Sequence, residues 1–200
     1  MANQVSAKDV SSLRTKTGAG MMDCKKALME TQGDVEKAVD YLRTKGIAKA
    51  EKRAGKAASQ GVVFAYQHFT GKVGVLVEIN CETDFVARTD TFQELAKDVA
   101  LHVASTSPVA VTAAEVPEDL LAREKAIIEA QVAESGKPEA VREKMVEGKI
   151  KKYLKERVLL DQPFVKNDKM TVEQLVQEVS SKVGEKIVIR RIQRFALGEE

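Results

Sequence analysis

The sequence predicts an α+β protein, and three observations carry that prediction. Apolar residues recur at helical spacing over residues 6–46 and alternate with polar ones over residues 62–80. Two long, charge-rich helical patterns follow over residues 117–158, and a last alternating segment over residues 186–195 supplies a third strand. This order of elements is typical of an α+β protein with a small antiparallel sheet, packed helices and a long helical hairpin.

Residues 1–46 are predicted to form three short helices. Ser6, followed three residues later by Asp9, has the pattern of a capping box at the start of the first helix. Asp34 can cap the third helix, and Gly46 is expected to end it. A unit this small has a marginal core, which favours a docking module tethered to something larger.

A glycine-rich turn, residues 17–20, separates the first helix from a second one over residues 22–31. Met21 and Met22 follow the turn, and Met22 suits the inside of the helix packing. Adjacent helical positions point about 100° apart, so one methionine can enter the core while the other offers an adaptable contact surface. Burial of both methionines fits the sequence equally well.

The segment from residue 45 to residue 60 is basic. Its basic residues are Lys45, Lys49, Lys52, Arg53 and Lys56. Such a run is typical of a solvated helix extension or linker. A contact with phosphates or a ribosome is the alternative, although the aromatic residues that would stack on bases are missing.

Residues 73–88 begin as a half-buried strand in which apolar residues alternate. They are Val73, Val75, Val77 and Ile79. The alternation ends at the polar residues 80–84, which favour a loop, and Phe85 follows. Burial of a phenylalanine contributes roughly 1.5–3 kcal/mol. Phe85 therefore either folds back into its own core or faces a partner.

A strand hairpin over residues 62–80 is expected to turn near Gly71. Thr91 and Glu94 form a capping-box pattern for the helix that follows. Residues 117–158 then predict a helical hairpin, which either packs on the sheet or projects as a dimerisation arm.

Composition excludes several classes of protein. The chain has 200 residues, 32 Lys+Arg against 30 Asp+Glu, and 44% hydrophobic residues. This near balance of charge does not indicate a nucleic-acid-binding protein, and no apolar run is long enough to span a membrane. The N-terminus has no signal-peptide pattern, so we expect a cytoplasmic protein with Cys24 and Cys81 as free thiols.

Residues able to carry out chemistry are scarce. His68 and His102 lie far apart in the sequence, and Cys81 has no partner at metal-ligand spacing. The Gly18-Ala19-Gly20 fragment lacks the remaining residues of a phosphate-binding loop. We therefore expect no catalytic residue, no metal and no cofactor, and an enzyme is the least favoured class.

Four segments resemble one known family. Residues 13–28 (LRTKTGAGMMDCKKAL) and 77–88 (VEINCETDFVAR) resemble the two signatures of the bacterial translation elongation factor Ts family. Residues 66–68 (YQH) and 143–165 (EKMVEGKIKKYLKERVLLDQPFV) are also similar to that family. The matches occur in family order, and the resemblance covers essentially the whole chain.

The resemblance implies a guanine-nucleotide exchange factor for elongation factor Tu, the GTPase that delivers aminoacyl-tRNA to the ribosome. It implies a three-helix, ubiquitin-associated-like domain with a basic linker over residues 1–54, and an α+β core and dimerisation domain over residues 55–200. The partner would be Tu in its GDP-bound and nucleotide-free forms, with no direct contact to nucleic acid or membrane.

The resemblance also implies roles for individual residues. The motif that intrudes near the magnesium site of Tu matches Thr83, Asp84, Phe85 and Val86. The N-terminal docking surface on the GTPase domain matches Arg14, Met21, Met22 and Lys25. His68 would lie on the core surface that faces another domain of Tu.

This chain departs from the longer family members, which contain two copies of the core subdomain, because it has room for only one. We expect it to form a homodimer in which a second protomer supplies the missing surface, giving a complex of two chains with two copies of Tu. Two other hypotheses stay open: an adaptor that uses residues 18–22 for a different partner, and an RNA- or ribosome-associated protein that uses residues 45–56.

Overall fold

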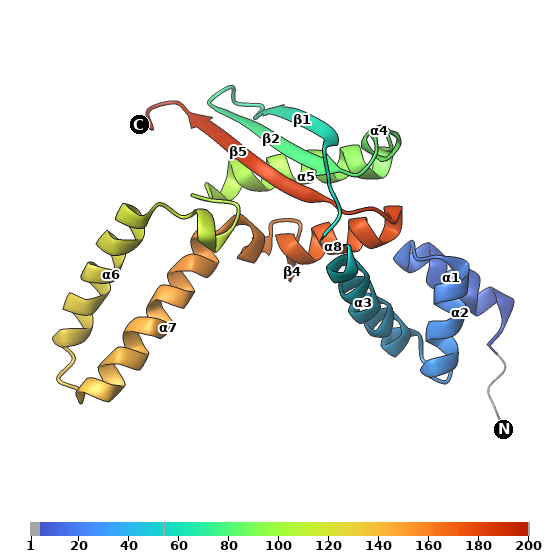
Figure 1. The fold of residues 1–200 in the computed structure, drawn as a ribbon, viewed down its shortest axis with the longest axis horizontal. Coiled ribbons are helices and arrows are strands. Elements are labelled where there is room, and N and C mark those ends of the chain that lie inside the picture. The colour runs from blue at the N-terminus through green and yellow to red at the C-terminus, as the bar shows by residue number, and fades with distance from the viewer. Residues whose placement is uncertain (1–4, 54, 200) are drawn as a thin grey trace. The chain divides into compact units, whose positions relative to one another are not determined.

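The computed structural model describes residues 5–53 and 55–199, and the side chains of residues 47–52 and 140 lie outside that description. Figure 1 shows the order of the elements along the chain: helices first, then a strand hairpin, further helices and a closing strand. The predicted α+β class, with a small three-stranded antiparallel sheet, is confirmed.

Contacts divide the chain into two compact units, each built from segments far apart in the sequence. The first unit contains residues 1–61, 80–95 and 174–188. The second unit contains residues 62–79, 96–173 and 189–200. The predicted domain boundary between residues 54 and 55 stays a prediction, since residue 54 lies outside the described residues.

Three helices open the first unit: α1 (Ala7–Thr17), α2 (Met21–Glu30) and α3 (Val35–Lys52). The predicted capping box is confirmed, because Ser6 Oγ accepts a hydrogen bond from the Asp9 N–H at 3.1 Å and the Asp9 carboxylate accepts one from the Ser6 N–H at 3.3 Å. The three helices share one small apolar core. Its buried residues are Val10, Leu13, Cys24, Ala27, Leu28 and Ala38.

The prediction that Gly46 ends the third helix is wrong, because α3 continues to Lys52. Gly46 is buried, and a Cβ atom there would lie 3.3 Å from Oγ and 3.4 Å from Cβ of Ser181. Ser181 belongs to α8 (Val172–Val183). Gly46 therefore allows two helices to approach closely, and it does not stop either of them.

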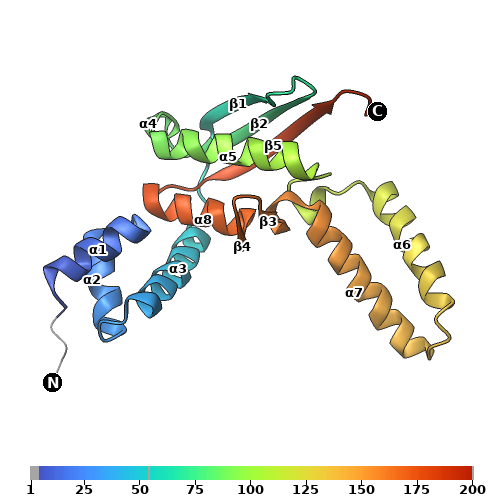
Figure 2. The ribbon, with the colours of Figure 1, turned by 180° about the vertical axis from the view of Figure 1, so that it is seen from behind.

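The sheet of the second unit has the strand order β1 (Gln60–Gln67), β2 (Val73–Cys81) and β5 (Val188–Ala196). The predicted turn is confirmed, because the His68 N–H donates to the Val73 carbonyl at 2.9 Å and Gly71 has a φ of +68°. Figure 2 shows α5 (Asp90–Thr106) lying along one face of this sheet. The buried side chains of β2 alternate as predicted.

The helix α5 starts earlier than its predicted capping box. Its first residue is Asp90, so Thr91 lies inside the helix and cannot cap it. Thr89 takes that place, with its hydroxyl accepting a hydrogen bond from the Phe92 N–H at 3.4 Å. Thr89 lacks the acidic residue three positions later that made Thr91 look like a cap, because that position is the fully buried Phe92.

The predicted helical hairpin is confirmed in the second unit, with α6 (Glu118–Ala133) and α7 (Glu139–Arg157) lying side by side (Figures 1 and 2). Gly136 forms the connecting turn with a φ of +64°. The base of the hairpin packs through buried Val116 and Val158. A short sheet of β3 (Pro163–Phe164) and β4 (Asn167–Thr171), which the sequence did not predict, follows it.

A fully buried histidine, His102, joins α5 to the end of α7 in the second unit. Its Nδ1 accepts a hydrogen bond from the Val165 N–H at 3.2 Å, so its Nε2–H donates to Gln162 Oε1 at 2.8 Å. Gln162 Nε2 in turn donates to the Glu156 carbonyl at 2.7 Å, in the last turn of α7. Burial lowers the pKa of His102, which keeps the ring neutral.

The described helices include none that is both long enough and apolar enough to cross a membrane.

Candidate functional site

The motif residues Thr83 to Val86 form a capped helical turn, so the loop expected over residues 80–84 is confined to Glu82 and Thr83. Thr83 is the N-cap of α4 (Asp84–Ala87), and its hydroxyl accepts a hydrogen bond from the Val86 N–H at 3.4 Å. Threonine is a favoured N-cap because its side-chain oxygen satisfies an N–H that the first turn leaves unpaired. The polar residues that indicated a loop are in part the cap of this helix.

The two halves of α4 face opposite environments. Val86 and Ala87 are buried, whereas the Phe85 side chain is 77% exposed. Asp84 is also exposed, and its carboxylate accepts a hydrogen bond from Arg88 Nη2 at 3.0 Å. Phe85, Asp84 and Arg88 line a shallow recess of about 330 Å³. Of the two interpretations of Phe85, burial in its own core is therefore excluded for the free chain.

The N-terminal end of α4 is held by a residue that the sequence analysis did not single out. The Glu185 carboxylate accepts hydrogen bonds from the Glu82 N–H at 3.1 Å, from the Thr83 N–H at 3.0 Å and from the Thr83 hydroxyl at 2.6 Å. Glu185 lies in the connection between α8 and β5. No local pattern marks it, because its partners lie about a hundred positions earlier in the chain.

Glu82, directly before the cap, is the centre of a second charged cluster. Its carboxylate accepts hydrogen bonds from Lys56 Nζ at 2.8 Å, Arg53 Nη1 at 3.3 Å and the Lys186 N–H at 2.7 Å. The Lys56 ammonium, with help from the Lys186 N–H and Arg53, lowers the pKa of Glu82 to about 2. Glu82 is thus an anion at all physiological pH values.

The C-terminal end of α4 is also fixed. Gln93 Nε2 donates to the Ala87 carbonyl at 2.7 Å, and the Thr89 hydroxyl donates to the Val86 carbonyl at 2.8 Å. Just before the helix, the buried Cys81 thiol donates to the Thr83 carbonyl at 3.1 Å, and burial raises its pKa. Side chains on both sides therefore satisfy the backbone of this short helix.

The predicted N-terminal docking residues lie on the outer surface of α1 and α2. Arg14 and Lys25 are exposed, and the side chains of Met21 and Met22 are 53% and 75% exposed. The prediction that Met22 points inward is wrong, as is the alternative in which both methionines are buried. Cys24, together with Ala27 and Leu28, fills the inner face of α2 instead.

His68 belongs to the second unit and lies at the end of the β1–β2 hairpin. His68 is half-buried, and its Nδ1 lies 3.0 Å from the Tyr66 hydroxyl oxygen. The centroids of the His68 and Phe69 rings lie 4.4 Å apart. The Phe69 side chain is 90% exposed. His68 is accessible in this arrangement but makes no contact that assigns it a role.

The basic segment after residue 45 is partly committed to the fold. Arg53 and Lys56 pair with Glu82, and Lys45 Nζ lies 4.9 Å from the centroid of the Tyr41 ring. The side chains of Lys49 and Lys52 lie outside the described residues. The helix extension predicted for this segment is present as far as Lys52, and Arg53 and Lys56 beyond it are in addition ion-paired with Glu82.

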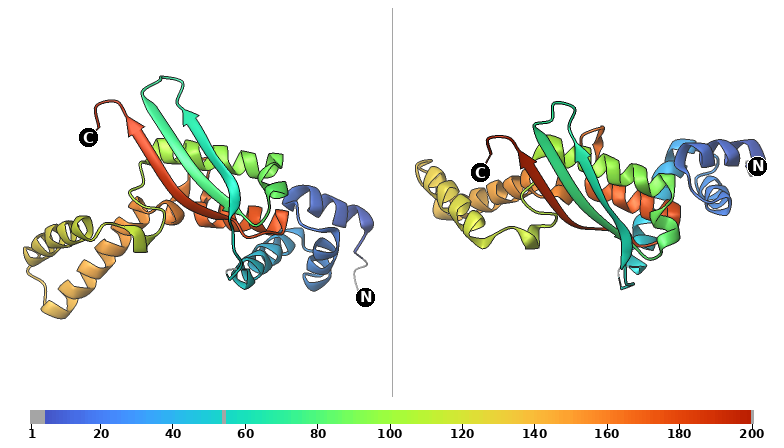
Figure 3. Two further views of the ribbon diagram at one scale, coloured as in Figure 1. Left: turned by 45° about the horizontal axis from the view of Figure 1, so that its top comes forward. Right: turned by 90° about the horizontal axis from the view of Figure 1, so that it is seen from above.

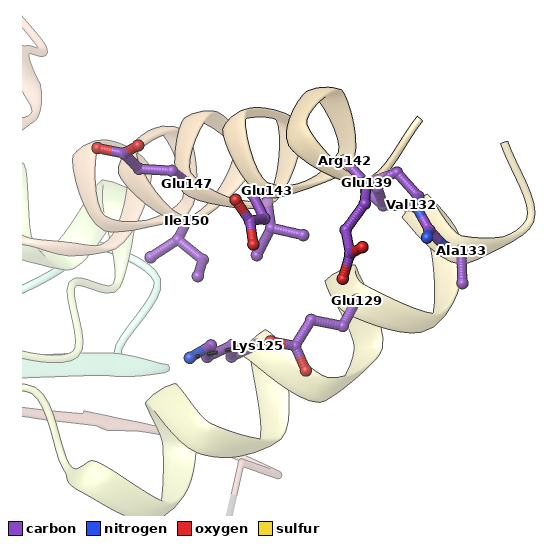
Figure 4. A pocket seen from close by; sticks show the side chains of 10 residues that line it. Lys125, Glu129, Val132, Ala133, Glu139, Arg142, Glu143, Glu147 and Ile150 are labelled. Atoms are coloured by element: carbon purple, nitrogen blue, oxygen red, sulfur yellow. Dashed lines mark ion pairs between the residues drawn. The ribbon is translucent and has the colours of Figure 1, made fainter. Parts of the chain in front are cut away.

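A cleft of about 580 Å³ lies between α6 and α7 in the second unit. Figure 4 shows Lys125 and Glu129 of α6 across from Glu143 and Ile150 of α7. Among the described residues that line it there is no histidine, cysteine, serine or threonine. Within the described ranges, no three metal-ligating side chains come together, and Cys24 and Cys81 are free and buried.

The motif residues thus present an exposed aromatic side chain, Phe85, on a helix anchored at both ends. Aromatic side chains presented in this way are typical of proteins that act by binding other macromolecules. The chain belongs to the elongation factor Ts family, because the family model described as "Elongation factor TS" matches residues 4–199. Its role is that of a translation elongation factor.

Individual relatives agree over the full length. The chain is 57% identical to an elongation factor Ts of Solidesulfovibrio magneticus, over 98% of each chain. It is 54% identical to one of Syntrophomonas wolfei, over 98% of this chain and 91% of the relative. It is 52% identical to one of Syntrophobacter fumaroxidans, over the whole of both chains.

Proposed function

We propose that this chain is the guanine-nucleotide exchange factor of elongation factor Tu. It binds Tu in its GDP-bound form, disturbs the magnesium and phosphate site through Asp84 and Phe85, and promotes release of GDP during translation elongation. Exchange requires no covalent chemistry. Because binding free energies are coupled reciprocally, a factor that binds nucleotide-free Tu more tightly than GDP-bound Tu weakens GDP by the same factor.

The observation that carries the proposal is the exposure of Phe85 on an anchored helix. An exposed phenylalanine that becomes buried in a partner contributes roughly 1.5–3 kcal/mol. Magnesium bridges the nucleotide phosphates and protein oxygens, so a wedge that displaces the ion removes much of the affinity for the nucleotide. Asp84 carries a negative charge next to Phe85, where it can perturb groups around the ion.

Two further surfaces support the interaction. Arg14, Met21, Met22 and Lys25 would dock the three-helix module on the GTPase domain of Tu. All four are exposed, and flexible methionines next to cationic side chains make an adaptable contact. His68, at its hairpin, would face another domain of Tu. These surfaces would hold Phe85 in register, as a binding hot spot needs a surrounding contact area.

We also propose that the protein is a cytoplasmic homodimer, which gives a complex of two chains with two copies of Tu. The uncovered face of its sheet supports this, seen in the left panel of Figure 3 with the strands in front of α5. Val63, Leu76 and Phe195 are exposed, one from each strand. Exposed apolar side chains on one sheet favour association. A clean monomer in sedimentation at micromolar concentration would refute the dimer.

The test of exchange is the release of a fluorescent GDP analogue from Tu with catalytic amounts of this chain. We expect acceleration that is lost in the double variant Asp84→Ala/Phe85→Ala. Acceleration that survives in the double variant would keep the exchange activity and refute the wedge. No acceleration by the unaltered chain would refute the exchange function and favour the adaptor hypothesis.

A further inference from the structure

We propose that Glu185 is the positioning residue of the exchange reaction: through the backbone and hydroxyl of Thr83 it fixes the direction in which α4 presents Phe85. This inference rests on the proposed function. Glu185 itself is remote in sequence from the motif and acts through Thr83.

The first reason is that α4 cannot hold its own shape. It contains four residues, Asp84–Ala87, and a helix of one turn is far too short to be stable alone because nucleation is unfavourable. Its first N–H groups also have no partner within the helix. The Thr83 hydroxyl accepts a hydrogen bond from one of them, the Val86 N–H, and the Glu185 carboxylate in turn holds Thr83 by its hydroxyl and its N–H. The direction of the exposed half of the turn therefore depends on Thr83 and on the carboxylate that holds it.

The second reason is the geometry of the three hydrogen bonds. One Glu185 oxygen, Oε2, accepts from two successive N–H groups, of Glu82 and Thr83, while the other, Oε1, accepts from the Thr83 hydroxyl. Two backbone groups and one side-chain group held by one carboxylate leave Thr83 little freedom to rotate. Hydrogen bonds to an ionised acceptor are about twice as strong as neutral ones.

The third reason is that Glu185 is itself held in place. Gly184, with a φ of +76°, ends α8, and the Ser180 hydroxyl donates to the Glu185 carbonyl at 2.5 Å. The next N–H, of Lys186, donates to the Glu82 carboxylate at 2.7 Å. Glu82 and Glu185 thus exchange hydrogen bonds, each carboxylate accepting from the backbone of the other's segment. A reciprocal arrangement of this kind fixes two segments more firmly than a single bond.

The test measures two quantities: the half-saturating concentration of the chain, which reports its binding to Tu, and the maximal rate of GDP release. In the GDP-release assay, Glu185→Ala is expected to lower the maximal rate on the order of tenfold and to leave the half-saturating concentration within about twofold, since the docking surface of α1 and α2 is untouched. Glu185→Gln keeps the length of the side chain and one acceptor oxygen, so it should recover part of the rate. Glu178→Ala, at an exposed position of α8, removes the same charge and is the matched control.

A second readout needs no partner. The chain contains no tryptophan, so Phe85→Trp places a single fluorescent reporter on α4. Adding Glu185→Ala to Phe85→Trp should lower the steady-state anisotropy and raise quenching by acrylamide, whereas adding Glu178→Ala should change neither. Circular dichroism checks the fold, and if Glu185→Ala does not fold, Glu185→Gln carries the comparison.

The outcomes separate the two proposals. If the unaltered chain fails to accelerate GDP release, the proposed function is refuted, and the reporter alone then shows whether Glu185 positions α4. Unchanged anisotropy and quenching in the folded Glu185 variant would overturn the positioning role. So would a rise in the half-saturating concentration at an unchanged maximal rate. A lower maximal rate together with a more mobile reporter would establish it.

Discussion

Each of the two units of this protein contains a network of side-chain hydrogen bonds. One network is built from charged groups and the other from neutral groups. The network around α4 in the first unit is charged, with the carboxylates of Glu82 and Glu185 at its centre. The network in the second unit is neutral and buried, with His102 and Gln162 at its centre. The first supports an exposed side chain, and the second joins the interior to the end of a long helix.

The difference follows from the cost of desolvation. A charge in the interior loses much of its hydration, so a buried network is better built from neutral groups. Near the surface, water and partly exposed cations such as Lys56 offset that loss, and charged hydrogen bonds can hold a short segment rigidly. We therefore expect changes in the neutral network to act mainly on stability, and changes around α4 to act mainly on exchange.

The largest effect is expected from His102→Ala. It deletes a buried side chain and leaves the Val165 N–H without its acceptor, which should lower the free energy of unfolding by about 2–4 kcal/mol. Urea denaturation followed by circular dichroism measures the loss. His68→Ala, at a half-buried histidine, is the control. An equal loss of unfolding free energy in both variants would contradict a special role of the buried network in stability.

Phe85→Ala should slow nucleotide exchange and leave the stability of the fold almost unchanged. Removing a binding hot spot worth about 2 kcal/mol slows catalysed GDP release roughly thirtyfold. Because Phe85 is exposed, the free energy of unfolding should change by less than about 0.5 kcal/mol. Phe69→Ala removes an exposed phenylalanine of the other unit, and a matching loss of exchange there would show that exposure alone matters.

Acid should weaken the neutral network first. Since the pKa of His102 is lowered in the folded chain from an ordinary 6.5, the unfolded chain binds a proton there before the folded chain does. The free energy of unfolding should therefore fall as the pH drops below about 6.5, by at most about 1.4 kcal/mol per pH unit. Urea midpoints between pH 8 and pH 5 measure this, and His102→Gln should flatten that part of the profile.

The charged network around Glu82 should lose its stabilising hydrogen bonds only at lower pH. The folded pKa of Glu82 is about 2 against an ordinary 4.5, so its stabilisation is present above pH 4.5 and is lost as the pH falls toward 2. In the Phe85→Trp background, the anisotropy of the reporter should decline within that window. Glu82→Gln should remove this part of the decline, and an unchanged decline would assign it to other carboxylates.

Much of the fold could be predicted from local patterns. The turn at Gly71 and the two helices over residues 117–158 lie where glycine, proline and apolar spacing indicated them. The motif Thr83–Val86 could also be picked out as a candidate site. Its support could not, because the partners of Glu185 lie 102 and 103 positions away.

Two of the corrections have packing as their cause. Gly46 looks like a helix stop until Ser181 of α8 is found against it. Met22 looks like a core residue until Cys24 is seen filling the inner face of α2. In both cases the packing, which the local pattern does not contain, decided the outcome.

By itself, the sequence determined the family and the order and type of the longer helices and strands, since caps, turns and apolar periods depend on neighbours along the chain. Only the tertiary structure decided that Phe85 is exposed and that Glu82 and Glu185 hold the helix that carries it. Hydrogen bonds between remote residues form only once folding has brought the segments together, and they leave no periodic trace in the sequence.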